Sequence, residues 1–337
     1  MTEKNSRTLD VLIPVYRPDE KLGHLLYMLN RQKIKPEKIV LMVTEAVGQA
    51  ENGGLERWIS ESTIPVECHV LSPEEFDHGG TRNRGISYCD SEIVLCMTQD
   101  AVPENEELTE ALIRPFYGEF CGAENGCISV SETDKGIRKT EILISYARQL
   151  PAPECKTVER YTRSFNYPEK SRLKTAEDIP ELGIKAFFAS NVCAAYRREL
   201  FWKQGGFPER TIFNEDMIFA GRAVKAGYGI AYAAEARVIH SHNLSGREQF
   251  HRNFDLAVSQ TEHPEVFAGI RSEGEGLRLV KSTVKYLLKC GKFYLIPGMV
   301  WTTGCKYLGY LLGKRYKRLP KRFVRACSLN KRYWGDK

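Results

Sequence analysis

Short extended segments alternate with helical segments over the first hundred residues. A run of leucines at helical spacing follows the first extended segment, between residues 19 and 32, and a second helix is predicted over residues 81–89. This alternation predicts a mainly parallel sheet with helices on its faces. Ligands bind beyond the carboxyl ends of the strands in such sheets, so polar clusters at those ends are candidate site residues. The predicted strands cover residues 9–16, 38–43, 66–71 and 93–97.

The second half of the chain has a less regular pattern. Prolines interrupt a charged stretch over residues 151–180, which predicts loops and short helices. Regular structure is expected again with an extended segment over residues 187–196, a helix through Trp202, a helix starting near Glu215 and strands near Ile230 and Val238. We therefore expect one α/β domain over residues 1–265 and a helical region over residues 266–337.

The carboxyl-terminal region concentrates positive charge. The whole chain has a net charge of +6, but the segment from Lys281 onward contains 15 basic residues and a single acid, Asp336. Over residues 277–292 a lysine stripe adjoins an apolar stripe, which suits a helix lying on an anionic membrane surface. A solvated helical pair packed on the main domain, or a contact in a homo-oligomer, is the alternative. The longest uncharged stretch nearby has 13 residues, and a membrane-spanning helix needs about 20.

Composition excludes several classes of protein. Hydrophobic residues make up 42% and charged residues 27%, which is the mixture of a folded globular chain and not of a collagen-like or disordered one. The ten cysteines include no Cys-x-x-Cys pair, so zinc ribbons and thioredoxin-type sites are not expected. The amino end lacks the apolar run of a secretion signal. These features predict a cytoplasmic protein with reduced thiols.

Two clusters have the residue types of a metal site. Asp100 directly follows a predicted strand, where its carboxylate could bind a hard divalent cation or simply cap the next helix. His240 and His242 are two residues apart at the end of another strand, so their side chains share a side if the strand continues. Two imidazoles and a carboxylate suit Mn²⁺ or Zn²⁺, although paired histidines are more often plain surface residues.

Two further motifs lie at predicted helix starts. Glu215 and Asp216 follow Asn214, where acids are stabilised by the helix amides and where one carboxylate could also act as a general base. Residues 77–85 place paired glycines before Arg82 and Arg84, which favours phosphate binding. This stretch is neither a dinucleotide fingerprint nor a Walker loop, which disfavours dinucleotide oxidoreductases and P-loop kinases.

The order of these motifs resembles the family 2 glycosyltransferases, which use nucleotide sugars and have the GT-A fold. The matching motifs are IPVY at 13–16, HGGTRN at 78–83, TQDA at 98–101, Asn191, GGFP at 205–208, NED at 214–216 and VIHSH at 238–242. FDHGGTRN, TQDAVP, YARQLP at 146–151 and the basic tail are similar to the bacterial rhamnosyltransferases of surface polysaccharide assembly.

The resemblance implies a role for individual residues. Asp100 matches the second acid of the Asp-x-Asp motif that binds Mg²⁺ or Mn²⁺, with Thr98 in place of the first acid, and His240 or His242 completes the metal site. Asp216 matches the catalytic base, with Glu215 beside it. The implied donor-binding residues are Pro14, Tyr16, Glu45, His78, Arg82, Asn83, Gln99 and Asp100. The implied acceptor-binding residues are Arg148, Gln149 and Asn191.

The implied reaction is inverting, metal-dependent transfer of L-rhamnose from dTDP-β-L-rhamnose to a lipid-linked saccharide at the inner face of a bacterial membrane. A transferase of the same fold that uses a UDP-hexose or UDP-N-acetylhexosamine is the nearest alternative. A glycosidase would instead use two carboxylates and no metal. A non-catalytic membrane-binding protein with a decayed transferase domain belongs to another class. A nucleic-acid partner is not expected, because the basic tail has little aromatic periodicity for base stacking.

Overall fold

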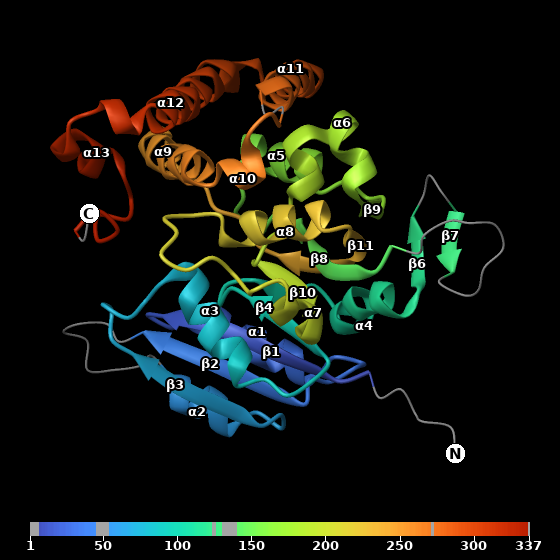
Figure 1. Cartoon of the computed structure of the whole chain (residues 1–337). Coiled ribbons are helices and arrows are strands. Elements are labelled where there is room, and N and C mark those ends of the chain that lie inside the picture. The colour runs from blue at the N-terminus through green and yellow to red at the C-terminus, as the bar shows by residue number, and fades with distance from the viewer. Residues whose placement is uncertain (1–6, 45–53, 123–125, 130–139, 271–272, 336–337) are drawn as a thin grey trace.

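A computed structural model describes residues 7–44, 54–122, 126–129, 140–270 and 273–335 (Figure 1). Within these residues, nine strands form one mixed sheet in the order β3-β2-β1-β4-β10-β8-β11-β5, with β9 paired to β11. The strands of this sheet are β1 (Leu9–Tyr16), β2 (Lys38–Thr44), β3 (Val66–Leu71), β4 (Ile93–Met97), β5 (Val102–Pro103), β8 (Ile142–Leu150), β9 (Arg172–Lys174), β10 (Cys193–Arg197) and β11 (Gly229–Ile239). A separate two-stranded sheet consists of β6 (Glu119–Gly122) and β7 (Gly126–Ser129).

Helices surround the sheet, and further helices follow the last strand toward the carboxyl end of the chain. The α-helices are α1 (Glu20–Asn30), α2 (Leu55–Ser60), α3 (His78–Ser87), α4 (Leu108–Ile113), α5 (Thr157–Asn166), α6 (Ile179–Leu182), α7 (Arg198–Lys203), α8 (Glu215–Lys225), α9 (Gly246–Glu262), α10 (Pro264–Phe267), α11 (Glu273–Lys289), α12 (Ile296–Lys314) and α13 (Lys321–Cys327). The short 3-10 helices among the described residues are η1 (Arg114–Tyr117), η2 (Ala176–Asp178), η3 (Gly183–Phe187), η4 (Phe293–Leu295) and η5 (Tyr316–Arg318).

The mainly parallel α/β architecture predicted from the sequence is confirmed. β3, β2, β1 and β4 run parallel to one another, and β8 runs parallel to β11. β10 lies between these two groups and is antiparallel to both of its neighbours. The carboxyl ends of β1, β4, β8 and β11 therefore meet at one edge of the sheet, and this edge positions the candidate site.

Three elements differ from the sequence prediction. The expected strand over residues 187–196 is confined to β10, because the residues before it form η3 and a short loop. The strands expected near Ile230 and Val238 are one strand, β11, whose register with β8 shifts between Ala233 and Arg237. The sequence pattern does not predict β8, which is an interior strand held by pairing to β10 and β11.

Alternating side chains along the strands divide the core into two layers. Val11 and Ile13 pack with α1, α2 and α4, whereas Leu12 packs with α3, α7 and α8 on the opposite face of the sheet. This alternation is the two-residue period of a strand that is buried on both faces. Every one of these three strand side chains is inaccessible to solvent. The result is a rigid sheet whose edge carries the polar residues.

The carboxyl-terminal helices pack on the α/β domain and on α9 (Figure 1). A Cβ atom at Gly309 of α12 would lie 2.2 Å from the carbonyl oxygen of Phe250, and one at Gly313 would lie 2.4 Å from that of Phe254. Only glycine allows α9 and α12 to approach this closely. The domain boundary at residue 265 stays a prediction, although α9, which packs on α12, lies before it. No helix of the described chain combines the length and the apolar character needed to span a bilayer.

Candidate active site

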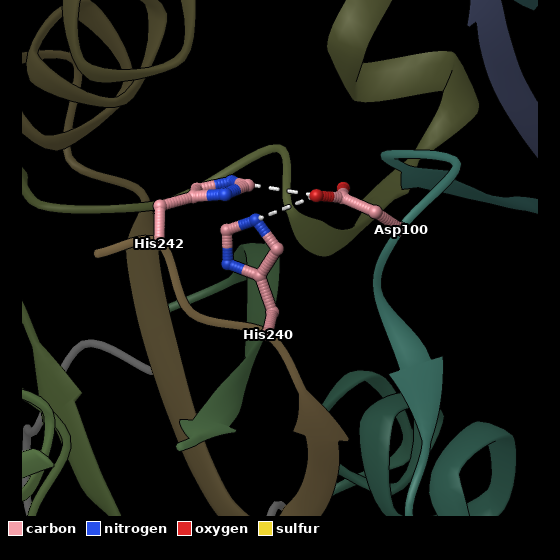
Figure 2. Close-up of side chains that lie close together, drawn as sticks. All are labelled: Asp100, His240 and His242. Atoms are coloured by element: carbon pink, nitrogen blue, oxygen red, sulfur yellow. Dashed lines mark ion pairs between the residues drawn. The ribbon is translucent and has the colours of Figure 1, made fainter. Parts of the chain in front are cut away.

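Asp100, His240 and His242 come together at the carboxyl edge of the sheet (Figure 2). Asp100 follows β4 and the two histidines follow β11, so strands far apart in sequence supply the three side chains. One carboxylate oxygen, Oδ2 of Asp100, lies 3.5 Å from Nε2 of His240 and 3.3 Å from Nε2 of His242. The ligand atoms of the three residues lie within 4.8 Å of one another. This set of one oxygen and two nitrogens suits a divalent transition metal ion.

A second layer of hydrogen bonds orients His240. Gln149 places its Oε1 3.2 Å from Nδ1 of His240, and Arg163 donates to the same amide oxygen. The amide nitrogen of Gln149 donates to Oγ of Ser190 at 3.1 Å, which fixes the direction of the amide group. His240 must therefore donate from Nδ1 and present the lone pair of Nε2 toward Asp100.

Burial keeps both histidines neutral. It lowers the pKa of His240 to about 3 and also lowers the pKa of His242. His240 is only 7% exposed, whereas neighbouring protein covers only part of the His242 ring. A neutral imidazole with a free Nε2 is the form that binds a metal ion.

A cavity of about 440 Å³ opens beside this cluster, at the ends of β1 and β4. Five of the predicted donor-binding or metal-binding residues lie on its wall: Pro14, Tyr16, Gln99, Asp100 and His242. Val15, Asp19, Lys21, Phe76 and Thr98 complete the lining. The cavity therefore joins the candidate metal site to the loop that follows β1.

Gln99 has a positioning role in this cavity. Its Oε1 accepts from the backbone N–H of Tyr16 at 2.8 Å, and its Nε2 donates to the carbonyl oxygen of Tyr16 at 3.0 Å. Both ends of the amide are thus used to fix the end of β1. The side chain of Tyr16 is half exposed and faces solvent.

Glu215, which is buried, and Asp216, which is half-buried, form a second cluster at the start of α8. Nη1 of Arg82 lies 3.1 Å from Oε1 of Glu215, which also accepts from Nδ2 of Asn191 at 3.1 Å. Asp216 accepts from the backbone N–H of Asn191 at 3.0 Å and from that of Met217 at 2.7 Å. Asn214, just before the helix, has a φ of 66°, a left-handed conformation that asparagine tolerates.

The pKa values of the two carboxyl groups shift in opposite directions. Burial by itself raises the pKa of Glu215, but the Arg82 guanidinium, His78 and the hydrogen bond from Asn191 together outweigh it and hold that pKa below its ordinary value. Burial and the charge of Glu215 raise the pKa of Asp216 to about 7. Burial and Glu215 thus outweigh the stabilisation that the helix amides give to the ionised form of Asp216. A carboxyl group that titrates near neutral pH is in the range that suits a general base.

Two predicted acceptor-binding residues are buried behind the site instead. Gln149 and Asn191 are each 3% exposed. Gln149 orients His240, and Asn191 contacts both carboxylates while its Oδ1 accepts from the hydroxyl of Tyr196 at 2.7 Å. The acceptor contacts of these two residues stay predictions, and hydrogen bonds within the protein already use both side chains.

Arg148 lies on the other side of β8. Adjacent residues of a strand point to opposite faces, so Arg148 turns away from His240 and pairs with Glu169 at 3.2 Å. Its predicted acceptor contact gains no support from this geometry. Glu45, a predicted donor contact, lies outside the described residues.

The HGGTRN motif packs against the GGFP turn. Asn83 accepts from the backbone N–H of Phe207 at 2.9 Å and donates to the carbonyl oxygen of the same residue at 2.9 Å. A Cβ atom at Gly79 would lie 2.0 Å from the carbonyl oxygen of Pro208, so glycine is required there. The donor contact of Asn83 stays a prediction, and the turn already uses both ends of its amide.

Arg82 and His78 lie away from the cavity wall. Arg82 is buried against Glu215 and donates to the carbonyl oxygen of His78 at 2.9 Å. Burial lowers the pKa of His78. The donor contact of His78 stays a prediction, and Arg82 serves the carboxylate pair.

Sequence reasoning missed Arg163. It lies on α5, inside the stretch where prolines and charges predict loops and short helices, and no spacing links it to the histidines. Its guanidinium bonds to Gln149 and also to Glu159 at 2.8 Å. The only signal was that a charged, irregular segment follows a strand that ends at the site.

Comparisons with known proteins agree with this architecture. The family model named "Glycosyl transferase family 2" matches residues 67–205. The O-antigen chain rhamnosyltransferase WbaN of Salmonella anatum is 36% identical over 97% of this chain and 95% of its own length. RfbN of Salmonella typhimurium, with the same description, is 34% identical over 97% of this chain and 96% of its own.

A solved structure shares the fold at low sequence identity. The mannosyltransferase PcManGT from Pyrobaculum calidifontis, in complex with GDP-Man and Mn²⁺, superposes with a TM-score of 0.57 at 13% identity. The match covers 92% of this chain and 88% of that one. With relatives above 30% identity along almost its whole length, the chain belongs to glycosyl transferase family 2 and is a glycosyltransferase with the GT-A fold.

Proposed function

We propose that this enzyme transfers L-rhamnose from dTDP-β-L-rhamnose to a hydroxyl of a lipid-linked saccharide during synthesis of a cell-surface polysaccharide. The choice of sugar rests on the similarity to two O-antigen chain rhamnosyltransferases, which are 36% and 34% identical over nearly the full length of this chain. The 440 Å³ cavity beside Asp100 is the place for the nucleotide sugar.

A divalent metal ion fits the cluster of Asp100, His240 and His242. The three ligand atoms converge, and Gln149 leaves Nε2 of His240 free to bind. When bound, such an ion offsets the negative charge that develops on the departing nucleoside diphosphate. Two imidazole ligands favour Mn²⁺ over Mg²⁺, which prefers oxygen ligands and water.

Asp216 acts as the general base. The N–H groups of Asn191 and Met217 orient its carboxylate, and its pKa of about 7 lets it take a proton from the acceptor hydroxyl. The hydroxyl oxygen then attacks the anomeric carbon as the bond to the diphosphate breaks. A single displacement inverts that centre, so the β-linked donor gives an α-linked product.

The carboxyl-terminal helices dock on the anionic inner face of the cell membrane. Lys281, Lys285 and Lys289 of α11 are exposed, and lysines near an anionic leaflet contribute about 1 kcal/mol each. Large apolar side chains are also exposed on α11, η4 and α12: Leu277, Leu288, Phe293, Tyr294, Val300, Trp301, Tyr307 and Leu308. Exposed aromatic residues beside lysines are typical of a membrane-surface helix, and a second copy of the chain is the alternative occupant of this surface.

A donor panel tests the proposed function. The purified enzyme with Mn²⁺ and a lipid-linked saccharide is given dTDP-L-rhamnose, a UDP-hexose or a UDP-N-acetylhexosamine, and the product linkage is determined. We expect turnover with dTDP-L-rhamnose and an α-linked product. Preference for a UDP-sugar would overturn the choice of donor, and absence of turnover with every donor would support a decayed, non-catalytic protein.

A further inference from the structure

Lys21 is the one lysine or arginine on the described wall of the donor cavity. The wall also carries two acids, Asp19 and Asp100, and His242, whose pKa burial lowers. Lys21 is exposed, and among the described residues its ammonium group has no hydrogen bond, ion pair or aromatic ring as a partner. The cavity wall therefore presents a cation whose N–H donors are free to bind a ligand.

The turn between β1 and α1 places Lys21 on this wall. Arg17 has a φ of 50°, a left-handed conformation that is uncommon for arginine. Nε2 of Gln99 donates to the carbonyl oxygens of Tyr16 at 3.0 Å and of Arg17 at 3.5 Å, so the loop after β4 holds the turn. Asp19 caps α1 and accepts from the backbone N–H of Lys21 at 3.1 Å. The backbone of Lys21 is thus fixed, while its side chain reaches the cavity.

The same cavity joins Lys21 to the candidate metal site. Asp100 and His242 line it together with Lys21. β1, which leads to α1, is the sheet neighbour of β4, which leads to Asp100. Burial is the main cause that lowers the pKa of His242, and the positive charge of Lys21 is among the further causes. An anion bound at the metal cluster would therefore have Lys21 beside it.

The charges at the metal cluster do not balance a diphosphate. Asp100 supplies the one carboxylate of the cluster, and burial lowers the pKa values of His240 and His242, so a bound divalent ion would keep a single net positive charge. The diphosphate of a nucleotide sugar carries one negative charge on each phosphate group, and further charge develops as its bond to the sugar breaks. Asp19 adds negative charge to the same wall. A second cation is therefore needed beside the cluster.

We propose that Lys21 binds the diphosphate of the donor and offsets the charge that develops on it as the sugar leaves. An ammonium group approaches phosphate oxygens as a point charge with several N–H donors. Its attraction grows as the charge on the leaving group grows, so it stabilises the transition state more than the bound donor. The inference rests on the proposed function, since it takes this cavity as the donor site.

Calorimetry measures the contact without requiring turnover. dTDP is titrated into Mn²⁺-loaded wild type, Lys21→Gln, Lys21→Arg and Lys35→Gln. We expect dTDP to bind about 10-fold more weakly to Lys21→Gln, whereas Lys21→Arg keeps the charge and should retain most of the affinity. Lys35→Gln is the matched control, because it removes an exposed lysine that does not lie on the cavity wall. It should bind dTDP like the wild type.

Thymidine, which lacks both phosphate groups, shows whether the loss is specific to the diphosphate. Ligand-observed NMR should give the same thymidine affinity for the wild type and Lys21→Gln, within about twofold. Unchanged dTDP binding in Lys21→Gln, or an equal loss of thymidine binding, would overturn the proposed contact.

Steady-state kinetics test the effect on the leaving group. The kcat of Lys21→Gln should be about 10-fold below that of the wild type, because the charge beside Lys21 increases during the reaction, and Lys35→Gln should stay within about twofold. An unchanged kcat in Lys21→Gln would overturn the role of Lys21 in offsetting that charge.

Failure of the proposed function would give a different pattern. If transfer required a UDP-sugar, UDP binding would show the same dependence on Lys21, so the choice of donor would fail and the diphosphate contact would stand. If the wild type did not bind Mn²⁺ but dTDP binding still depended on Lys21, the metal site would fail and the contact would stand.

Discussion

The metal cluster and the carboxylate pair both contain ionisable groups, but only the carboxylates already have hydrogen-bond donors as partners. At Asp100, His240 and His242, ligand atoms face one another across a gap of 3.3–3.5 Å, next to an open cavity. At Glu215 and Asp216, donors from Arg82, Asn191 and Met217 already contact the carboxylates. The first arrangement leaves lone pairs for a cation, and the second sets the proton affinity of one oxygen.

This contrast separates two tasks of a displacement reaction. Charge on the leaving group has to be offset on one side of the sugar, and a proton has to be removed from the acceptor on the other. A cluster of neutral imidazoles beside an open cavity suits the first task. A desolvated carboxyl group with a pKa of about 7 suits the second.

The largest expected effect comes from removing the base. Asp216→Asn keeps the size of the side chain and should lower kcat by about 10²–10⁴-fold, the range attributed to general base catalysis. The comparison of kcat in steady-state assays with dTDP-L-rhamnose checks this. A variant with nearly wild-type turnover would remove Asp216 from the proposed role.

A smaller effect is expected from the residue behind His240. Gln149→Leu removes the acceptor for Nδ1 of His240 and should weaken Mn²⁺ binding by about 10–100-fold, as other outer-shell changes do. The Mn²⁺ dependence of activity measures this effect. If Gln149 contacted the acceptor, as the sequence suggests, the acceptor KM would rise and the Mn²⁺ dependence would not change.

The sequence predicts the first half of the sheet well because its strands are short, apolar and separated by regular helices. It does not predict β8, in which Ser145, Arg148 and Gln149 break the apolar pattern and pairing with β10 and β11 decides the conformation. Tertiary contacts outweigh local pattern at such a strand.

The candidate site also has a part that the sequence predicts and a part that it does not. The resemblance to family 2 glycosyltransferases grouped Asp100, His240 and His242, and strand ends that meet at one edge of the sheet bring them together. The contacts of Gln149, Asn191 and Asn83 could not be predicted, because motif position does not show whether a polar side chain faces a cavity or a buried partner. The pKa of Asp216 also depends on burial and on the charge of Glu215, which sequence alone does not reveal.

The smallest expected effect is a shift in pH dependence. Because Asp216 must be ionised to accept a proton, kcat should rise with pH through about 7. Glu215→Gln removes the negative charge that raises the pKa of Asp216. It also leaves the positive charge of Arg82 without its partner, and this charge lowers the pKa of Asp216. The rising limb should therefore move to lower pH.

The pH profile of kcat for the wild type and for Glu215→Gln checks this shift. Circular dichroism serves as a control, since the substitution leaves the Arg82 guanidinium buried without its partner. A limb that stays in place in a folded variant would mean that another group controls the profile.

The division of tasks between the two clusters is tested most directly by calorimetric titration of Mn²⁺ and dTDP into the wild type, Asp100→Asn and Asp216→Asn. We predict that Asp216→Asn binds Mn²⁺ and dTDP like the wild type, whereas Asp100→Asn loses Mn²⁺ binding. Loss of Mn²⁺ binding in Asp216→Asn, or full binding in Asp100→Asn, would contradict the separation of the metal site from the base.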